Sequence, residues 1–414
     1  MPQILKIQAL FLSSALLMFG GGLQGLLLSV RGAQEGFSIF ALGLIGTGWS
    51  VGFIAGSIMV PMLVRRVGHI RAYSVMAALG AITILLNLLW INDIGWIVLR
   101  VFSGFCFAGA AMIVESWLNE VSDNKGRGTI FSLYVMVNMS ASTLGQLSMS
   151  ITGIAGYLPF VIGALAFSSA LLPTALTTRP QPRPLTSAKI NLPLLYRTSP
   201  IAVIASFAIG IGNGTFGTLA PVYGYLQGLK PADIAQMMSI AIVMGALSQV
   251  PFGRLSDRVD RRWVIIGASV FASVTGLALV LVNPFGGWPL FVLFGLYGFA
   301  SYPIYAVAIA HANDAAKDGD FASIAAGMLL TLGLGLAIGP LIGAYVMRIW
   351  QPVDLFLVTA TFHAILAILA FVRMHMRPLD ASEERSPFRP VQIGKNSTLA
   401  STILDPRADE ASNQ

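Results

Sequence analysis

The sequence predicts an all-α membrane protein with twelve transmembrane helices, arranged as two parallel six-helix pseudo-repeats. Hydrophobic residues make up 56 % of the 414 residues and charged residues only 10 %, with a mean hydropathy of +0.77. This composition excludes a soluble globular protein. Apolar stretches long enough to cross a bilayer recur along the whole chain. The two halves of the sequence also repeat one another in the placement of glycines and polar residues.

Twelve apolar stretches reach about 20 residues, the length that a helix needs to cross the hydrocarbon core. They lie near residues 8–30, 39–64, 71–91, 94–118, 128–152, 156–177, 201–226, 232–252, 263–283, 288–312, 322–349 and 353–374. A polar connector with several prolines follows the sixth stretch and indicates a linker. We expect an N-terminal half at 1–177, a cytoplasmic linker at 178–200, a C-terminal half at 201–376 and a disordered cytoplasmic tail at 377–414.

The internal repeat rests on a set of matches between the halves. A shift of 192 residues places 20–25 on 212–217 and Arg66 on Arg258, and a shift of 194 places Gly104 on Gly298, Asn119 on Asn313 and Gly145 on Gly339. Two parallel six-helix repeats are the arrangement in which transporters form a substrate site near the membrane midplane, between the halves.

The distribution of basic residues predicts the orientation in the membrane. If the N-terminus is inside, only Arg31, Lys230 and Arg348 of the 25 Lys and Arg residues fall outside, Arg100 lies within a span, and the other 21 are cytoplasmic. Basic residues accumulate on the cytoplasmic side of membrane proteins. We therefore expect a multi-pass protein of the plasma (inner) membrane with both termini in the cytoplasm.

Other compositional features exclude several classes of protein. The net charge of +7 does not indicate a nucleic-acid partner, because the basic residues are dispersed among short loops. Cys106 is the single cysteine, which excludes an intramolecular disulfide and a cysteine metal cluster. No nucleotide-binding loop, nucleophile elbow or zinc-ligand pattern occurs. We expect neither an enzyme nor a bound cofactor or metal.

A charged segment at 253–262 separates two apolar stretches and is predicted to be a cytoplasmic turn, with the preceding helix ending at Gly253. Asp257 can accept hydrogen bonds from N–H groups at a helix N-terminus, and the arginines supply cations beside helix C-termini. We call the predicted contact between helices the latch. Its residues are Gly253, Asp257, Arg258, Arg261 and Arg262, together with Arg66 and Gly68 in the first half.

The spacing Gly-x-Leu-Ser-Asp-Arg-x-x-Arg-Arg in this segment resembles the signature loop of the major facilitator superfamily of secondary transporters. In that family the loop recurs between helices two and three and between helices eight and nine. Here Asp260 stands where the family usually has glycine. The first-half loop keeps Arg66 and Gly68 but has Arg65 where the family has aspartate, so the acidic latch residue survives only in the second half.

Arg100 is the residue of the fourth span that costs the most free energy to insert into a membrane. An arginine within a span costs at least ~2.5 kcal/mol and usually faces a cavity or a partner. The pattern Arg100-x-x-x-Gly104-x-x-x-Ala108 also resembles the family's second signature, which is linked to proton coupling. The alternative is an arginine that extends to water at the outer interface.

Glu115 lies on the same helix face as Arg100, about 22 Å further along. It is either a protonatable carboxylate that lines a cavity or an interfacial glutamate that reaches water. We therefore name Arg100 and Glu115 as coupling candidates.

Neutral polar residues on several spans are candidates for the substrate cavity, which the resemblance places among spans one, four, seven and ten. Each could instead form a hydrogen bond between helices. The candidates are Gln24, Asn138, Asn213, Tyr302, Tyr305 and His311, and Tyr134 and Gln146 on span five offer similar groups.

These features together predict a secondary active transporter that moves a small solute by alternating access and is coupled to protons. The expected partners are the solute, protons and the lipid bilayer, and we expect a monomer. One alternative is a multidrug/proton antiporter. Pro340 in span eleven resembles part of a drug-antiporter signature, but span five has Gly145-Gln146 without a proline, which disfavours export. The other alternative is a non-transporting membrane receptor on the same scaffold.

Overall fold

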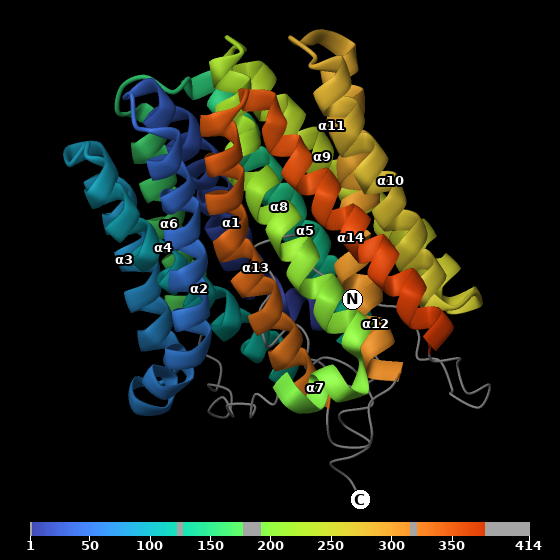
Figure 1. The fold of residues 1–414 in the computed structure, drawn as a ribbon. Coiled ribbons are helices and arrows are strands. Elements are labelled where there is room, and N and C mark those ends of the chain that lie inside the picture. The colour runs from blue at the N-terminus through green and yellow to red at the C-terminus, as the bar shows by residue number, and fades with distance from the viewer. Residues whose placement is uncertain (1, 122–126, 177–191, 315–320, 377–414) are drawn as a thin grey trace, which may run out of the picture.

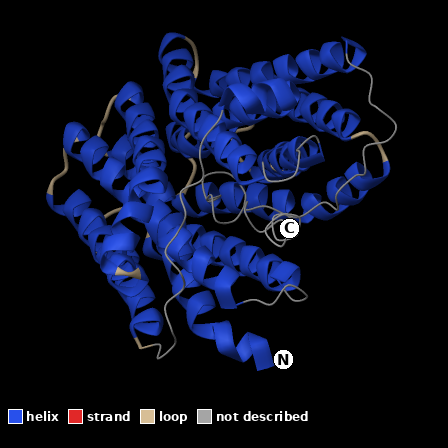
Figure 2. Ribbon diagram, turned by 90° about the horizontal axis from the view of Figure 1, so that it is seen from below, coloured by secondary structure: helices blue, strands red, loops and turns tan. Residues whose placement is uncertain are grey.

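The computed structural model describes residues 2–121, 127–176, 192–314 and 321–376, and this part of the chain is helical without a β-strand (Figures 1 and 2). The first half contributes α1 (Pro2–Gln34), α2 (Ile39–Val67), α3 (His69–Leu89), α4 (Asp93–Val121), α5 (Arg127–Thr152) and α6 (Leu158–Ala175). The second contributes α7 (Leu192–Thr198), α8 (Pro200–Leu226), α9 (Pro231–Arg258), α10 (Arg261–Val282), α11 (Gly287–Ser301), α12 (Pro303–Asp314), α13 (Phe321–Ile349), a 3-10 turn (Pro352–Asp354) and α14 (Leu355–Met376). The all-helical membrane fold is confirmed.

Each of the twelve stretches found in the sequence corresponds to helical structure. Eleven segments are long and apolar enough to cross a membrane. The fifth, α5, is 26 residues long but does not meet that standard of hydropathy, because polar residues recur along it, among them Asn138, Ser142 and Gln146. Of the predicted linker, 192–198 forms the short helix α7, while 178–191 and the predicted tail lie outside the described residues.

The tenth span is interrupted at Tyr302, between α11 and α12. Pro303 begins α12 and has no N–H to continue the hydrogen-bond ladder of the preceding turn, so the helix breaks there. The interruption places Tyr302 at the central cavity described below.

The prediction that a helix ends at Gly253 is wrong. The helix α9 continues to Arg258, and only Val259 and Asp260 separate it from α10. Residues 254–258 extend the helix because none of them is glycine or proline, so the backbone ladder runs on to Arg258. The latch is therefore built on the facing ends of two helices rather than on a ten-residue turn.

Glycines with the same role occupy matching positions in the two repeats. A Cβ atom on Gly104 would overlap the carbonyl oxygen of Trp49, and one on Gly298 would overlap that of Ala241. The same relation holds for Gly145 with Phe19 O and for Gly339 with Ile211 O. In each half the fourth span thus packs closely on the second, and the fifth span packs closely on the first. The glycine matches found in the sequence reflect these shared backbone contacts.

Substituting Gly145 with alanine is expected to lower the melting temperature of the purified protein. The new Cβ would meet the Phe19 backbone, and overpacking of this kind costs about 1–3 kcal/mol. Gly267→Ala is the matched control, because nothing lies within 4 Å of a Cβ built there. It should leave the melting temperature unchanged or slightly raised. Equal melting temperatures for the two variants would contradict the packing argument.

The two halves touch along helix pairs that are distant in sequence. The helix α13 lies beside α2 (Figure 1), where a Cβ on Gly43 would lie 2.7 Å from Pro340 O. The Thr47 hydroxyl donates to Ala337 O at 2.6 Å.

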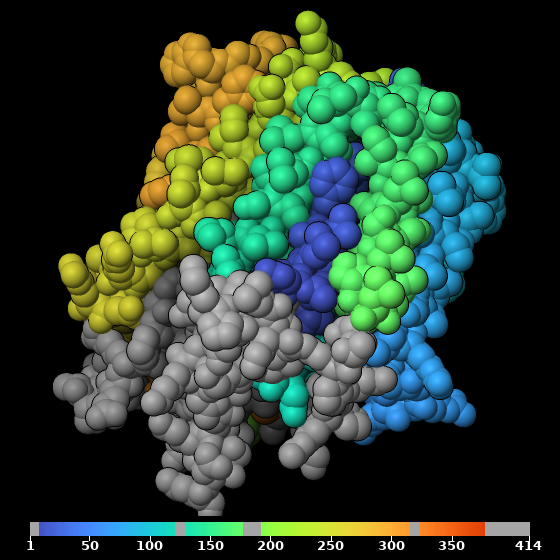
Figure 3. All heavy atoms as spheres, turned by 180° about the vertical axis from the view of Figure 1, so that it is seen from behind, coloured from blue at the N-terminus to red at the C-terminus, as the bar shows by residue number. Residues whose placement is uncertain are grey.

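On the opposite face of the molecule, α1 is seen between α5 and α6, within the first half (Figure 3).

Candidate functional site

A cavity of about 120 Å³ lies between the two halves. It receives side chains or backbone from α1, α2, α4 and α5 of the first half and from α8, α9 and the α11–α12 break of the second. Its lining residues are Gly21, Gly22, Gly25, Leu26, Trp49, Arg100, Phe107, Ser142, Gln146, Asn213, Gly217, Met238, Ile242 and Tyr302. None of these is acidic. The cavity therefore combines one cation, several neutral polar groups and an apolar wall.

Arg100 is the charged residue of this lining. Its exposed fraction is 4 %, and its Nε is buried without a hydrogen-bond partner among the described residues. The guanidinium carbon lies 5.9 Å from the centroid of the Trp49 ring, a cation–π contact. An arginine that extended to water at the outer interface would be exposed, so this burial favours the cavity interpretation. Arg100 thus presents hydrogen-bond donors to the cavity without an acidic partner in the described chain.

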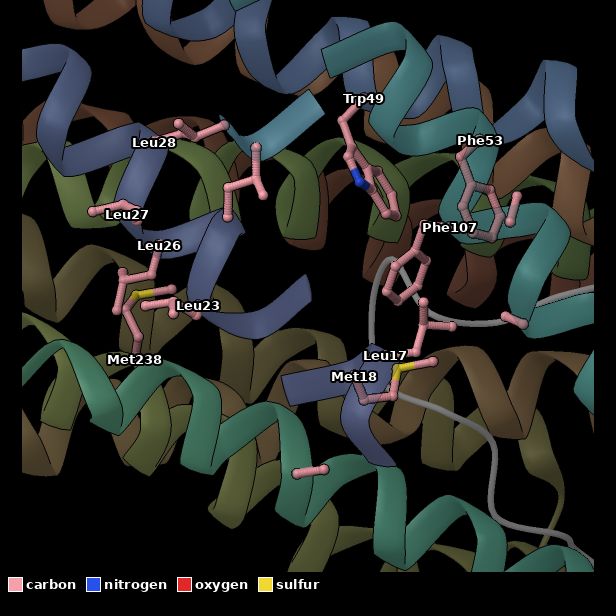
Figure 4. Packing of buried hydrophobic residues seen from close by; sticks show 14 of the residues in the cluster. Leu17, Met18, Leu23, Leu26, Leu27, Leu28, Trp49, Phe53, Phe107 and Met238 are labelled. Atoms are coloured by element: carbon pink, nitrogen blue, oxygen red, sulfur yellow. The ribbon is translucent and has the colours of Figure 1, made fainter. Parts of the chain in front are cut away.

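Aromatic side chains form the wall next to Arg100. Figure 4 shows Trp49, Phe53 and Phe107 gathered on neighbouring helices. The Trp49 ring centroid is 5.1 Å from that of Phe53 and 5.6 Å from that of Phe107. A flat or apolar part of a solute would find a surface here, beside the cation.

Glycines of α1 provide room in the cavity. A Cβ on Gly21 would lie 2.5 Å from the Phe107 ring, whereas one on Gly25 would meet nothing within 4 Å. The first glycine lets α1 approach α4 closely, and the second leaves open space. A side chain placed at Gly25 would therefore occupy the cavity without an initial clash.

The structure brings together some of the residues selected from the sequence. Arg100, Asn213 and Tyr302 line the cavity, and so does Gln146. Asn213 is 7 % exposed and its Oδ1 accepts a hydrogen bond from Ser301 at 2.8 Å. These residues come from four different helices or helix ends.

Other candidates lie away from this lining. The Gln24 Oε1 accepts a hydrogen bond from Ser103 at 2.7 Å, and the Asn138 Oδ1 accepts one from Ser14 at 2.7 Å. Both side chains therefore join helices, although the Nε2 of Gln24 and the Nδ2 of Asn138 have no partner among the described residues.

Two further candidates lie on α12. Tyr305 is 5 % exposed, and its hydroxyl has no hydrogen-bond partner among the described residues. His311 is partly exposed in the last turn of the helix. Neither residue belongs to the cavity lining.

Glu115 is fully buried and does not line the cavity. Its Oε1 accepts a hydrogen bond from the Tyr134 hydroxyl at 3.2 Å, which joins α4 to α5. The burial disfavours an interfacial glutamate that reaches water.

The latch has its shortest ion pair at Arg261. This side chain is 2 % exposed, and its Nε lies 2.6 Å from Asp314 Oδ2 at the end of α12. Its Nη2 lies 3.4 Å from Asp314 Oδ1, so the contact uses both carboxylate oxygens. Asp257 also pairs with Arg261, at 3.7 Å, and its side chain is 40 % exposed. Gly253 is buried next to these residues in sequence, whereas Arg258 is exposed.

Asp260 and Arg262 form a separate pair at the start of α10. Asp260 caps the helix by accepting from the Arg262 N–H at 2.9 Å, and the two side chains form an ion pair at 2.8 Å. Burial alone would raise the pKa of Asp260, but the hydrogen bonds and charge of Arg262 outweigh it and the pKa is lowered. The stabilisation from this shift is present above the ordinary pKa of aspartate and is lost as the pH falls through the lowered value. The aspartate that departs from the family pattern thus serves as a helix cap.

The first-half latch residues occupy the link between α2 and α3. Arg66 is exposed in the last turn of α2. Gly68 is the single residue between the two helices and has φ 84°, a left-handed value that favours glycine.

Several residues at the cavity were not selected from the sequence. Trp49, Phe107, Ser142 and Met238 line it, and Ser301 and His363 connect to it through Asn213. A buried histidine in an otherwise apolar span was the available signal for His363. The aromatic residues gave no such signal, because aromatic side chains are common in spans. Within the described ranges, no three His, Cys, Asp or Glu side chains gather as metal ligands.

A two-repeat helical membrane protein with a central cavity between its halves belongs to the class of membrane transporters, and the comparisons agree. A family model described as Major Facilitator Superfamily matches residues 10–248 and 202–404. The chain belongs to the Major Facilitator Superfamily and is a membrane transporter of that type.

Known proteins similar to this chain include members of the same family. It is 25 % identical over 350 residues to the "Uncharacterized MFS-type transporter YcaD" of Salmonella typhi, over 84 % of this chain and 90 % of that protein. Its fold is similar to that of the nucleoside transporter NupG, with a TM-score of 0.74 and 16 % identity, covering 91 % of this chain and 100 % of the other. An auto-inhibited peptide transporter of the POT family gives a TM-score of 0.72 at 11 % identity, covering 95 % and 99 %.

Proposed function

We propose that this protein is a secondary active transporter that moves a small organic anion by alternating access and couples its movement to protons. The observation that carries the proposal is Arg100, a buried cation that lines the cavity between the halves and has no acidic partner among the described residues. A buried charge is costly unless it is paired. An anionic solute would supply the missing pair, and a carboxylate fits the planar guanidinium with two parallel hydrogen bonds.

The size and lining of the cavity favour a small solute with an apolar part. A volume of about 120 Å³ is smaller than the ~300–1,000 Å³ typical of pockets for drug-sized ligands. This disfavours a multidrug antiporter. Trp49 and Phe107 supply a surface for a ring or an alkyl group. A receptor that does not transport would need neither an unpaired cavity cation nor the buried latch pair.

The same proposal includes the orientation. We place the chain in the plasma (inner) membrane as a monomer. Both termini are placed in the cytoplasm, because the basic residues follow the positive-inside distribution. In this orientation the α2–α13 contact at Gly43 and Thr47 lies toward the outer side. The two six-helix halves, divided at the linker 178–200, would rock about the cavity.

Proteoliposomes loaded with an anion test the proposed function. Benzoate and benzenesulfonate are the charged probes, and benzamide is the uncharged probe of similar shape. We expect exchange of external for internal label with either anion and none with benzamide. The Gly25→Leu variant should lose this exchange while it keeps its melting temperature, because its side chain enters open space in the cavity. Exchange of benzamide without exchange of either anion would contradict the proposal.

A further inference from the structure

A hydrogen-bond chain leads from the cavity to a buried histidine on α14. Asn213 lines the cavity, and its Oδ1 lies 2.8 Å from Ser301 Oγ. Ser301 Oγ lies 3.0 Å from His363 Nε2, and His363 Nδ1 lies 2.7 Å from the carbonyl oxygen of Thr359. Ser301 and His363 are 0 % and 1 % exposed. The chain joins three helices, α8, α11 and α14, in one half of the molecule.

The number of hydrogens in this chain depends on the charge of His363. A carbonyl oxygen only accepts, so the bond to Thr359 requires a hydrogen on Nδ1. If the imidazole is neutral, Nε2 has no hydrogen, and the single hydroxyl hydrogen of Ser301 must serve both Nε2 and Asn213 Oδ1. If His363 is an imidazolium, Nε2 donates to Ser301 and Ser301 donates to Oδ1, so every contact has its own hydrogen. The orientation of Asn213 in the structure therefore fits the protonated histidine.

The neutral histidine requires the opposite orientation of the Asn213 amide. Ser301 then donates to Nε2, and Nδ2 of Asn213 must donate to Ser301. Turning the Asn213 side-chain amide by 180° changes which of its two groups, Oδ1 or Nδ2, is left to face the cavity. With His363 protonated, the cavity receives the Nδ2 donors of Asn213 in addition to the guanidinium of Arg100. With His363 neutral, it receives the Oδ1 acceptor, which disfavours an anion.

Among the described residues, those around His363 include no carboxylate to offset an imidazolium. Tyr297 of α11 is the titratable side chain that faces the ring, with centroids 5.8 Å apart. On α8, Gly212 lies against the imidazole, where a Cβ would be 2.7 Å from Cε1. The charged or titratable residues of the helices packed around it lie near helix ends. They are Tyr223 and Tyr225 on α8, Arg261 and Arg262 on α10, Tyr345 and Arg348 on α13, and Arg373 and His375 on α14.

We propose that His363 is a proton-binding site that works through Ser301 and Asn213 to bind one proton together with one anion in the central cavity. The inference rests on the proposed function and specifies its coupling as symport. His363 takes up one proton at Nε2 and becomes an imidazolium. The bound anion supplies the negative charge that the described residues around His363 lack, so each ligand favours the other by the same factor. Histidine is suited to this role because both ring nitrogens donate when it is protonated and only one donates when it is neutral.

Ser301→Ala is the main test, because it interrupts the chain without changing the histidine. Benzenesulfonate is the probe, since it stays anionic at all relevant pH values. Wild-type protein should take up protons from an unbuffered solution when benzenesulfonate binds. Proteoliposomes should accumulate benzenesulfonate about tenfold for each pH unit by which the outside is more acidic than the inside. Ser301→Ala and His363→Gln should lose both responses, and their exchange without a gradient is measured beside that of the wild type. His375→Gln is the control on the same helix, because its exposed ring bonds only to Phe371 O among the described residues.

The outcomes separate this inference from the function on which it rests. Absence of anion exchange in the wild type would overturn both. If the wild type exchanges anions normally and Ser301→Ala keeps the proton response, only the role of the hydrogen-bond chain would be overturned. The same holds if the His375→Gln control loses the response as fully as His363→Gln.

Discussion

Replacing Arg100 with alanine is expected to abolish anion transport and to leave the melting temperature unchanged or higher. The guanidinium is the cation of the cavity, and losing one member of a buried charge pair costs about 2–5 kcal/mol, or about 30-fold and more in affinity. Without substrate, however, the same group is a buried charge that no acidic side chain of the described chain pairs, and removing such a charge relieves its desolvation cost. Opposite effects on transport and on stability thus identify a residue kept for its ligand.

The lysine variant distinguishes the cavity role from an interfacial one. Arg100→Lys should retain little exchange, because an ammonium does not reproduce the planar fork that holds a carboxylate. Exchange of labelled benzoate and thermal melting, at matched membrane expression, measure both effects. Arg348→Lys is the control, since Arg348 is exposed in the last turn of α13. Near-normal exchange by Arg100→Lys would return Arg100 to the interfacial interpretation.

Asp314→Asn is expected to cause the largest loss among changes at the latch. It leaves the buried Arg261 without its closest carboxylate, at 2.6 Å, and breaking a buried ion pair from one side costs about 3–5 kcal/mol. Ser256 Oγ, 3.3 Å from Arg261 Nη1, remains as a partner, so we expect the lower end of this range. The variant should melt at a lower temperature and transport more slowly than the wild type.

Asp257→Asn is the matched comparison for this prediction. Its side chain is 40 % exposed and lies 3.7 Å from Arg261, and exposed ion pairs contribute about 1 kcal/mol or less. The sequence motif emphasises Asp257, whereas the geometry gives Asp314 the shorter contact. Thermal melting and exchange rates of the two variants, measured side by side, decide between them. An Asp257→Asn variant as impaired as Asp314→Asn would contradict the ranking.

The fold was predictable because each membrane span requires an apolar stretch of about 20 residues, which the amino-acid sequence shows directly. Each span must hide its backbone in apolar sequence, so windows of hydropathy find the helices. The break at Tyr302 was missed because it does not change the average hydropathy. The extension of α9 to Arg258 was missed because the charged residues at 254–258 end the apolar stretch although the helix continues through them. The matches of Gly104 with Gly298 and of Gly145 with Gly339 were visible because a close backbone contact permits no other residue at those positions.

The site was predictable only where placing a residue in a membrane span costs much free energy. Arg100 could be selected because a charge in a span needs a reason. Gln24 and Asn138 could not be told apart from Asn213, because a polar residue in a span indicates burial and not the identity of its partner. The serine partners of Gln24 and Asn138 lie 79 and 124 residues away in the chain. Only the packed structure shows which polar groups are joined to each other and which face the cavity.

The contact between α2 and α13 contributes part of the cost of separating the halves. Pro340 has no N–H to offer Leu336 O, which loosens the backbone of α13 near Ala337, the residue that accepts from Thr47. Glycine at 43 adds no side chain that would have to be withdrawn. At this point the Thr47 hydrogen bond would be exchanged for bonds to water, and that exchange is a net change of about 0.5–1.5 kcal/mol. The hydrogen-bond contribution at this contact is therefore only a few RT. The bond can break and re-form by thermal motion when the two halves move relative to each other.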